Sequence, residues 1–234
     1  MTAERLRGIR ACVFDAYGTL FDVASAARRC ADALGAEVAP RLAALWRDKQ
    51  LQYTWLRAAQ NRHADFWQVT GDALDFALDA LRIADSGLRD QLMQFYWTLD
   101  AYPEVLAALR QLRDAGFPTA ILSNGSPTML AAAVAHAGLA DLFDHVLSVE
   151  AVGVYKPHPK VYQLACERLS LAAEAIVFVS SNGWDAWAAS AFGMRAVWCN
   201  RQRLTRERLP GAPDREISSL AELPDLLTAQ RGSG

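Results

Sequence analysis

The sequence predicts a doubly wound, Rossmann-like α/β fold, in which a parallel sheet carries helices on both faces and a helical cap is inserted after the first strand. Short, almost continuously apolar runs recur along the chain, and helix-length segments separate the later ones. About eighty residues after the first run have helical spacing and no convincing strand. With 234 residues and 52% hydrophobic side chains, the chain is long enough to bury a sizeable core.

Five apolar runs rich in β-branched or aromatic residues are predicted to be strands. Each is too short for a helix and lacks the alternation of a half-exposed strand, as expected of strands buried on both faces of a parallel sheet. They cover residues 9–14, 118–122, 145–149, 175–179 and 195–199.

Three segments between the later strands are predicted to be helices. They cover residues 103–115, 127–137 and 159–169, and each begins with a proline, which is favoured in the first helical turn. The first two end just before Gly116 and Gly138, which are suitable helix stops. Strands alternating with helices indicate a doubly wound sheet.

The segment after the first strand breaks this alternation and is predicted to form an all-helical insertion. Its apolar residues recur at helical intervals: Leu42, Leu45, Trp46, Leu51, Trp55, Trp67, Leu74, Ala77, Leu78 and Leu81. We therefore divide the chain into a core domain of residues 1–21 and 99–234 and a cap domain of residues 22–98.

Composition excludes several classes of protein. The net charge of −2 is too balanced to suggest a nucleic-acid partner, and no apolar run approaches the roughly 20 residues of a membrane helix. The N-terminus lacks the apolar stretch of a secretory signal, and the four cysteines include no C-x-x-C pair. These features predict a cytoplasmic protein. The cluster Arg201, Arg203, Arg206 and Arg208 is predicted to be a solvated face.

Polar residues follow the predicted strands at the edge where open parallel sheets bind ligands. The first strand is followed by Asp15 to Thr19, the second by Ser123, Asn124 and Gly125, and the third by a loop with Tyr155 and Lys156. The fourth is followed by Ser180 to Asp185. Two carboxylates, a lysine, small hydroxyls and an amide are therefore expected to converge on one edge.

Each of these residues has an ordinary explanation when it is taken alone. An aspartate at a strand end is usually a turn former or helix cap, which fits both Asp15 and Asp185. Lys156 before a proline suits a solvated position, Tyr162 suits the core and Arg47 suits a helix surface. The complete set at successive strand ends favours a catalytic site instead.

Four strings in these positions resemble the motifs of the haloacid dehalogenase superfamily. They are DAYGTLFD at 15–22, ILSNGSP at 121–127, YKP at 155–157 and VSSNGWD at 179–185. Their order and spacing agree with the superfamily from about residue 9 to residue 200. Together the four motifs are specific to it.

The position of Tyr17 decides between branches of the superfamily. Its phosphatases carry a second aspartate there for proton transfer and magnesium binding, and a tyrosine does not easily replace that carboxylate. The string at 15–22, together with LWRDKQL at 45–51 and QYTWLR at 52–57, is similar to the (S)-2-haloacid dehalogenase branch. Gly183 departs from the branch, which commonly has alanine there, and this puts the flexibility of the loop in doubt.

Chemistry and resemblance together assign roles to the strand-end residues. A carboxylate can displace halide from the α-carbon of a 2-haloacid and leave an ester on the enzyme, which water then hydrolyses. Asp15 is the predicted nucleophile, with Lys156 holding it ionised, Thr19 fixing its rotamer, and Asp185 and Asn182 orienting the hydrolytic water. The resemblance adds Ser180 to this catalytic group.

The remaining predicted residues bind substrate and halide. Ser123 and the backbone amides of Ala16 and Tyr17 are expected to receive the substrate carboxylate. The resemblance implies that Arg47 and Asn124 receive the departing halide. It also implies that Trp184 and Phe66 keep the pocket dry and that Tyr162 contributes to activity.

The resemblance implies a homodimer formed through the helical insertion. We expect no metal and no other cofactor, because magnesium in the phosphatases neutralises a phosphoryl group that a haloacid lacks. Two alternatives remain open: a small-metabolite phosphatase or phosphonatase of the same superfamily, and a non-catalytic binding protein that keeps the scaffold.

Overall fold

The computed structural model describes residues 5–29 and 34–227. It contains a six-stranded parallel sheet in the order β3-β2-β1-β4-β5-β6. The strands are β1 (Ala11–Phe14), β2 (Thr119–Ser123), β3 (His145–Ser148), β4 (Ile176–Ser180), β5 (Arg195–Cys199) and β6 (Arg215–Ile217). The predicted doubly wound α/β class is confirmed.

The core helices cover the sheet. They are α6 (Val105–Asp114), α7 (Pro127–His136), α8 (Pro159–Leu169), α9 (Gly183–Phe192) and α10 (Leu223–Leu227). Pro127 and Pro159 occupy the first turns of α7 and α8, as their sequences predict, and Ser126 caps α7 by accepting from the backbone N–H of Met129. Gly193 ends α9 in a left-handed conformation with φ of 109°.

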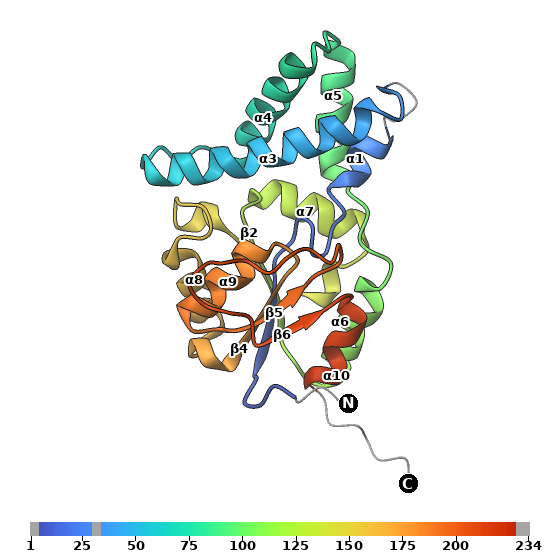
Figure 1. Cartoon of the computed structure of the whole chain (residues 1–234). Helices are drawn as coiled ribbons and strands as arrows, with labels where there is room; N and C mark the ends of the chain where they lie inside the picture. Colours follow the sequence, from blue (N-terminus) through green and yellow to red (C-terminus); the bar gives the residue numbers. More distant parts are fainter. Residues whose placement is uncertain (1–4, 30–33, 228–234) are drawn as a thin grey trace.

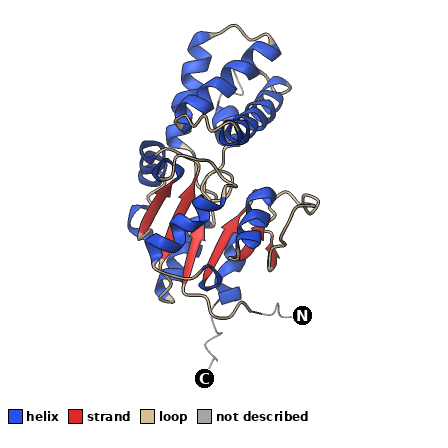
Figure 2. Cartoon of the chain, turned by 90° about the vertical axis from the view of Figure 1, so that its left-hand side faces the viewer, coloured by secondary structure: helices blue, strands red, loops and turns tan. Residues whose placement is uncertain are grey.

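Helices also form a layer above the carboxyl ends of the strands (Figures 1 and 2). They are α1 (Ala24–Arg29), α3 (Val38–Ala59), α4 (Phe66–Leu81), α5 (Ser86–Phe95) and the 3-10 helix η1 (Tyr96–Thr98). Helix α3 lies across the top of the core, and α4 packs along it (Figure 1). Asp65 and Asp85 cap α4 and α5 by accepting from backbone N–H groups of the first turn.

The helical layer leaves and re-enters the core at one place. Phe21 and Ala101 form an antiparallel bridge, and Asp22 N donates to Asp100 O at 2.8 Å. Tyr102 N donates to Leu20 O at 3.0 Å. The two connecting segments are therefore joined by backbone hydrogen bonds, directly after the turn that follows β1. We call this pairing of residues 20–22 with 100–102 the linker ladder.

Arg201 corrects one prediction. Its guanidinium donates to Thr19 O at 2.9 Å, forms an ion pair with Glu104 and lies 3.9 Å from the ring centroid of Tyr102. The prediction of a solvated arginine face is therefore wrong for Arg201, because acceptors from the core and from the linker ladder surround it. The other three arginines of the cluster are exposed.

Strand β6 was not predicted, because its three residues include one buried side chain and form no apolar run. The predicted bounds of the other strands and of three core helices agree with the structure within two residues.

Cys12, Cys166 and Cys199 are free thiols, and Cys30 lies outside the described residues. Within residues 5–29 and 34–227, no helix has the length and apolar character needed to cross a membrane.

Candidate active site

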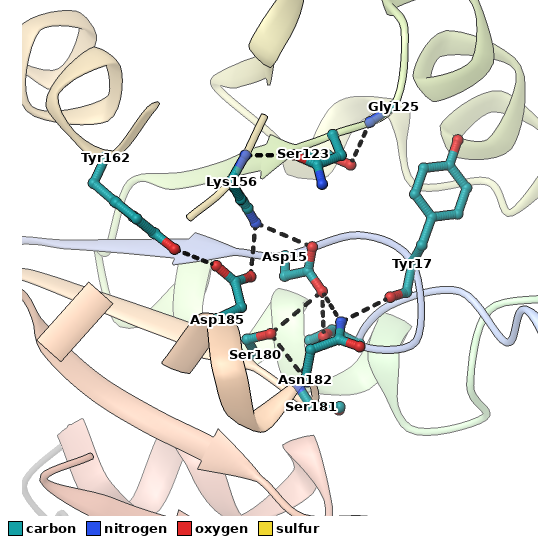
Figure 3. A network of polar contacts seen from close by, with 12 residues as sticks. Asp15, Tyr17, Ser123, Gly125, Lys156, Tyr162, Ser180, Ser181, Asn182 and Asp185 are labelled. Carbon is teal, nitrogen blue, oxygen red and sulfur yellow. Dashed lines mark hydrogen bonds and ion pairs between the residues drawn. The ribbon is translucent and has the colours of Figure 1, made fainter. Parts of the chain in front are cut away.

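The parallel topology brings the predicted residues to one edge of the sheet (Figure 3). Strand order changes direction between β1 and β4, and such a switch point is where doubly wound sheets bind ligands. Asp15 follows β1, Ser123 ends β2, Ser180 ends β4, and Asp185 lies in the first turn of α9. Lys156 comes from the loop before α8.

Asp15 receives an uneven set of hydrogen bonds. Its Oδ2 accepts from Asn182 Nδ2 at 2.7 Å, Thr19 Oγ1 at 3.0 Å and Ser180 Oγ at 3.3 Å. Its Oδ1 accepts from Lys156 Nζ at 3.1 Å. Among these donors, three therefore serve one oxygen, and the other oxygen has the lysine.

Backbone groups hold the donors of Asp15 in place. Ser181 N donates to Thr19 Oγ1 at 2.8 Å, which directs the hydroxyl hydrogen of Thr19 toward the carboxylate. Asn182 N donates to Ser180 Oγ at 3.1 Å with the same effect on Ser180. The turn after β4 thus presents its hydroxyl and amide groups to the end of β1 in a fixed orientation.

Lys156 lies between two buried carboxylates. Its Nζ donates to Asp15 Oδ1 at 3.1 Å and to Asp185 Oδ2 at 2.8 Å, and its side chain is 1% exposed. Burial alone would lower the pKa of Lys156, but the charges of both carboxylates outweigh it and the net pKa is raised. The lysine is therefore a fixed cation beside Asp15, and the alternative explanation of a solvated lysine is excluded.

Both oxygens of Asp185 are engaged. Oδ1 accepts from Tyr162 Oη at 2.7 Å, and Oδ2 accepts from Lys156. Burial raises the pKa of Asp185 to about 6, with the charge of Lys156 opposing the shift and that of Asp15 adding to it. Burial and then the charge of Asp185 raise the pKa of Tyr162 well above its ordinary value, so the tyrosine remains a neutral donor.

The turn after β2 forms another wall of the site. Ser123 Oγ accepts from Gly125 N at 3.1 Å, and Asn124 Oδ1 accepts from Lys156 N at 3.0 Å. The hydroxyl hydrogen of Ser123 and the NH₂ group of Asn124 are the donors that this turn can offer to an anion. Gly125 admits the ring of Tyr17, because a Cβ atom there would lie 2.6 Å from Tyr17 Cε2.

Tyr17 forms part of a dry aromatic wall. Its ring lies 5.7 Å from both Phe66 and Tyr96, centroid to centroid, and its hydroxyl is buried without a hydrogen-bond partner among the described residues. Burial raises the pKa of Tyr17 well above its ordinary value. Its neighbour Ala16 is fully buried, and the Ala16 carbonyl accepts from the turn that follows.

Arg47 brings a cation to the site from the helical layer. From α3, its Nη2 lies 3.3 Å from Asn182 Oδ1 and 3.4 Å from Tyr17 O, and its Nη1 donates to Gln50 Oε1 at 2.7 Å. Asn182 joins Arg47 to Asp15, because the NH₂ group of the same amide donates to the carboxylate. Arg47 is joined to the site through Asn182, whereas Asn124 is joined to it through the backbone N–H of Lys156.

Trp184 packs against the helical layer and lines an apolar groove. Its ring makes an edge contact with Trp55 of α3, with 5.4 Å between the ring centroids, and its Nε1 is buried without a hydrogen-bond partner in the described part of the chain. Both tryptophans line an apolar groove of about 810 Å³ between the end of α3 and helices α8 and α9. Tyr162 lines this groove as well, so its ring separates the groove from Asp185.

The sequence does not mark Gln50, Thr70 or Tyr96 as residues of the site. All three are buried in the helical layer and are linked by hydrogen bonds to one another and to Arg47. The available signal was Gln50, a polar residue four positions after Trp46 on the apolar face of α3. A polar residue at such a position needs buried partners.

The residues present do not fit a magnesium ion. Lys156 Nζ lies between the carboxylates of Asp15 and Asp185, where a cation would need their oxygens. The Tyr17 carbonyl accepts from Asn182 Nδ2 at 3.2 Å. The described part of the chain contains no group of three His, Cys, Asp or Glu side chains placed to hold a metal ion.

Comparison with known proteins gives consistent relatives over nearly the whole chain. A family model described as haloacid dehalogenase-like hydrolase matches residues 9–193. An (S)-2-haloacid dehalogenase from a Pseudomonas species is 46% identical over 94% of this chain and 96% of its own length. One from Burkholderia cepacia is also 46% identical, over 94% and 95%.

Solved structures give the same result. A crystal structure described as L-2-haloacid dehalogenase from Xanthobacter autotrophicus with chloropropionic acid covalently bound has a TM-score of 0.87 and 39% identity. The match covers 97% of this chain and all of that one. A structure described as a dehalogenase has a TM-score of 0.93 and 45% identity, covering 96% and 99% of the two chains.

Proposed function

The chain belongs to the haloacid dehalogenase-like hydrolases, and we propose that it hydrolyses (S)-2-haloacids to (R)-2-hydroxyacids and halide through an ester on Asp15. The observation that carries this proposal is the uneven environment of Asp15. One carboxylate oxygen accepts three hydrogen bonds, while the other has the lysine ammonium. Relatives that are 39–46% identical carry the name (S)-2-haloacid dehalogenase.

In the first step, Asp15 Oδ1 attacks the α-carbon of the substrate from the side opposite the halogen. The new C–O bond forms as the carbon–halogen bond breaks, and the halide leaves with the bonding electrons. Oδ1 is the better nucleophile, because the three donors on Oδ2 reduce the electron density available on that oxygen. Backside attack inverts the configuration of the α-carbon.

Binding must overcome repulsion between the substrate carboxylate and Asp15. Lys156 and Arg47 supply positive charge at the two sides of the nucleophile. Ser123 and the backbone amides of Ala16 and Tyr17 receive the substrate carboxylate, and Arg47 and Asn124 receive the halide. In a dry site such donors stabilise charge more strongly than water does.

In the second step, water attacks the ester carbon of Asp15. Oδ2 is then the carbonyl oxygen that gains negative charge, and the donors Thr19, Ser180 and Asn182 stabilise it as an oxyanion hole. Asp185, with Asn182, orients the water and accepts one of its protons. That proton passes to the departing alkoxide, which leaves as the hydroxyacid, and the second water proton is released when Asp15 regains its charge.

Halide release from (S)-2-chloropropionate tests the proposal against the phosphatase alternative. Wild type should release chloride, and hydrolysis of p-nitrophenyl phosphate with Mg²⁺ should stay at background. Asp15→Asn should abolish chloride release, with Asp22→Asn, which lies outside the site, as the matched control. Phosphate release without chloride release would overturn the proposal.

Residues 22–98 are proposed to act as the cap of this enzyme, on a core of residues 1–21 and 99–234.

Exposed apolar side chains on α3 and α4 support the homodimer expected of this layer: Trp55, Leu56 and Phe76 are 39%, 48% and 40% exposed. Sedimentation velocity should give a dimer for wild type and a monomer for the double variant Leu56→Glu and Phe76→Glu.

The free thiols of three cysteines agree with the proposed cytoplasmic location.

A further inference from the structure

Gln50 is a fully buried polar residue that contacts the cation of the site. It lies one turn after Arg47 on α3, has no exposed surface, and accepts from Arg47 Nη1 at 2.7 Å through its Oε1 atom. Tyr96 Oη donates to the same oxygen at 3.2 Å. The amide oxygen therefore binds two donors on the side that faces the site.

Thr70 fixes the orientation of this amide. Its hydroxyl donates to Phe66 O at 2.7 Å, so its oxygen is left to accept from Gln50 Nε2, also at 2.7 Å. Gln50 must then present its NH₂ group to Thr70 and its oxygen to Arg47. The Phe66 carbonyl can only accept. It therefore fixes which group donates and which accepts in each hydrogen bond of the series from Phe66 through Thr70 and Gln50 to Arg47.

The same chain continues to the nucleophile. Arg47 Nη2 approaches Asn182 Oδ1 at 3.3 Å, and Asn182 Nδ2 donates to Asp15 Oδ2 at 2.7 Å. Asn182 can donate to Asp15 only while its oxygen faces the guanidinium. The position of Arg47 therefore affects both the halide site and the orientation of a group that binds Asp15.

We propose that Gln50 is a positioning residue that holds the Arg47 guanidinium in place for halide with a neutral acceptor. This inference rests on the proposed function, because it assigns Arg47 to the departing halide. An arginine side chain has many rotamers, and one hydrogen bond donated to a rigid, buried amide oxygen restricts that freedom before the substrate binds.

The neutrality of Gln50 is essential to this role. A glutamate of the same size would hold the guanidinium equally firmly, but its negative charge would cancel the positive potential that attracts halide. Arg57, further along α3, has a charged partner instead: it forms an ion pair with the carboxylate of Asp72 at 2.9 Å. Arg47 at the site therefore has a neutral partner in Gln50, whereas Arg57 has an anionic partner in Asp72.

A purely structural role for Gln50, joining α3 to α4, makes different predictions. It would affect the stability of the helical layer and leave halide affinity unchanged in variants that fold. We therefore compare Gln50→Met, which removes the hydrogen bonds to Arg47, Tyr96 and Thr70, with Gln50→Glu, which keeps the size and adds a charge. Gln52→Met, at an exposed position of the same helix, is the matched control.

The first measurement is inhibition by bromide during turnover of (S)-2-chloropropionate. We expect the bromide inhibition constant to rise on the order of 10-fold to 100-fold in Gln50→Met, and further in Gln50→Glu, with Gln52→Met unchanged. Thermal unfolding of each variant is measured first, and Gln50→Glu decides the question if Gln50→Met does not fold. Bromide inhibition equal to that of the control would overturn the proposal.

A second measurement does not depend on the enzyme activity. With ¹⁵N-arginine labelling, restricted rotation should give resolved Hη signals for Arg47 in wild type and in Gln52→Met. Loss of these signals in Gln50→Met supports positioning even if wild type releases no halide, in which case only the proposed function fails. Unchanged Arg47 signals in Gln50→Met would overturn the positioning role, whatever the activity.

Discussion

The hydroxyl of Tyr162 donates to Asp185 Oδ1 at 2.7 Å, while Lys156 binds the other oxygen of the same carboxylate. Burial raises the pKa of Asp185 to about 6, and the tyrosine hydrogen bond opposes this rise. The carboxylate is therefore poised to change its charge close to neutral pH, as suits a group that accepts a proton from water.

Tyr162→Phe should move the acid limb of the pH–rate profile to higher pH. In the proposed mechanism turnover requires ionised Asp185, so the rate falls as the pH drops through the pKa of this group. Without the Tyr162 hydrogen bond the pKa of Asp185 rises, and we expect the limb to shift upward by about 0.5 to 1 pH unit. Steady-state chloride release measures the shift, with Tyr53→Phe as control. A downward shift would contradict this role.

Water oxygen should enter Asp15 before it enters the product. In a single turnover in H₂¹⁸O with excess enzyme, the label should appear in the peptide that contains Asp15, because water attacks the ester carbon. The hydroxyacid of that turnover takes its oxygen from the unlabelled carboxylate. Mass spectrometry of both species decides the point. Label found directly in the hydroxyacid would mean that water attacks the α-carbon.

The two enantiomers of 2-chloropropionate should behave differently. Asp15 approaches from one fixed direction, so the (S) enantiomer should be consumed completely and yield (R)-lactate, with the (R) enantiomer left. Chiral chromatography of the mixture before and after reaction measures both. Retention of configuration, or equal consumption of both enantiomers, would rule out a single backside displacement.

Metal removal should leave chloride release unchanged. Lys156 Nζ lies between the two carboxylates that magnesium would need, so neither EDTA treatment nor added Mg²⁺ should alter the rate. Rates are compared before chelation, after it and after Mg²⁺ is restored. Loss of activity that Mg²⁺ restores would show that the lysine gives way to a metal ion.

Two glycine substitutions should have opposite outcomes. Gly125→Ala places a Cβ 2.6 Å from Tyr17, whose ring is fixed between Phe66 and Tyr96. We expect kcat/KM to fall at least about 10-fold and the free energy of unfolding to fall by about 1–3 kcal/mol.

The nearest atoms to a Cβ in Gly183→Ala belong to the Glu207 side chain, with both Cγ and Oε1 at 3.0 Å. Because Glu207 is exposed and can move, this variant should keep activity within about twofold and unfolding free energy within about 1 kcal/mol. Urea unfolding and chloride release measure both glycine variants. Equal losses in the two would show that the site tolerates no added methyl group at either turn.

The sequence predicts strands β1 to β5 and the polar edge of the sheet. Buried parallel strands are apolar runs, and the residues that follow them must meet at one edge, so Asp15, Lys156, Ser180 and Asp185 are predicted to lie together. Strand β6 was missed because an edge strand with one buried residue has no such run. Its place depends on pairing with β5, which local pattern does not show.

Long-range polar contacts were equally beyond local pattern. Gln50 and Thr70 are far apart in sequence, and each alone is an ordinary helix residue, so their pairing depends on how α3 packs against α4. The solvated face predicted for Arg201 was wrong because its partners lie far away in the sequence: Thr19 follows β1, and Tyr102 and Glu104 precede α6. A run of charged residues predicts a solvated surface only when no acceptor from a distant part of the sequence binds one of its side chains.

The linker ladder makes the helical layer an exchangeable cassette. Both of its ends are fixed at one point by Asp22 N to Asp100 O and Tyr102 N to Leu20 O, so a loop of any length between them starts and finishes in the same place. Chimaeras that replace residues 23–99 with a helical layer of different pocket shape should therefore fold on an unaltered sheet. A grafted layer that keeps an arginine at the position of Arg47 should change the substrate range, while Asp15 stays in place at the end of β1.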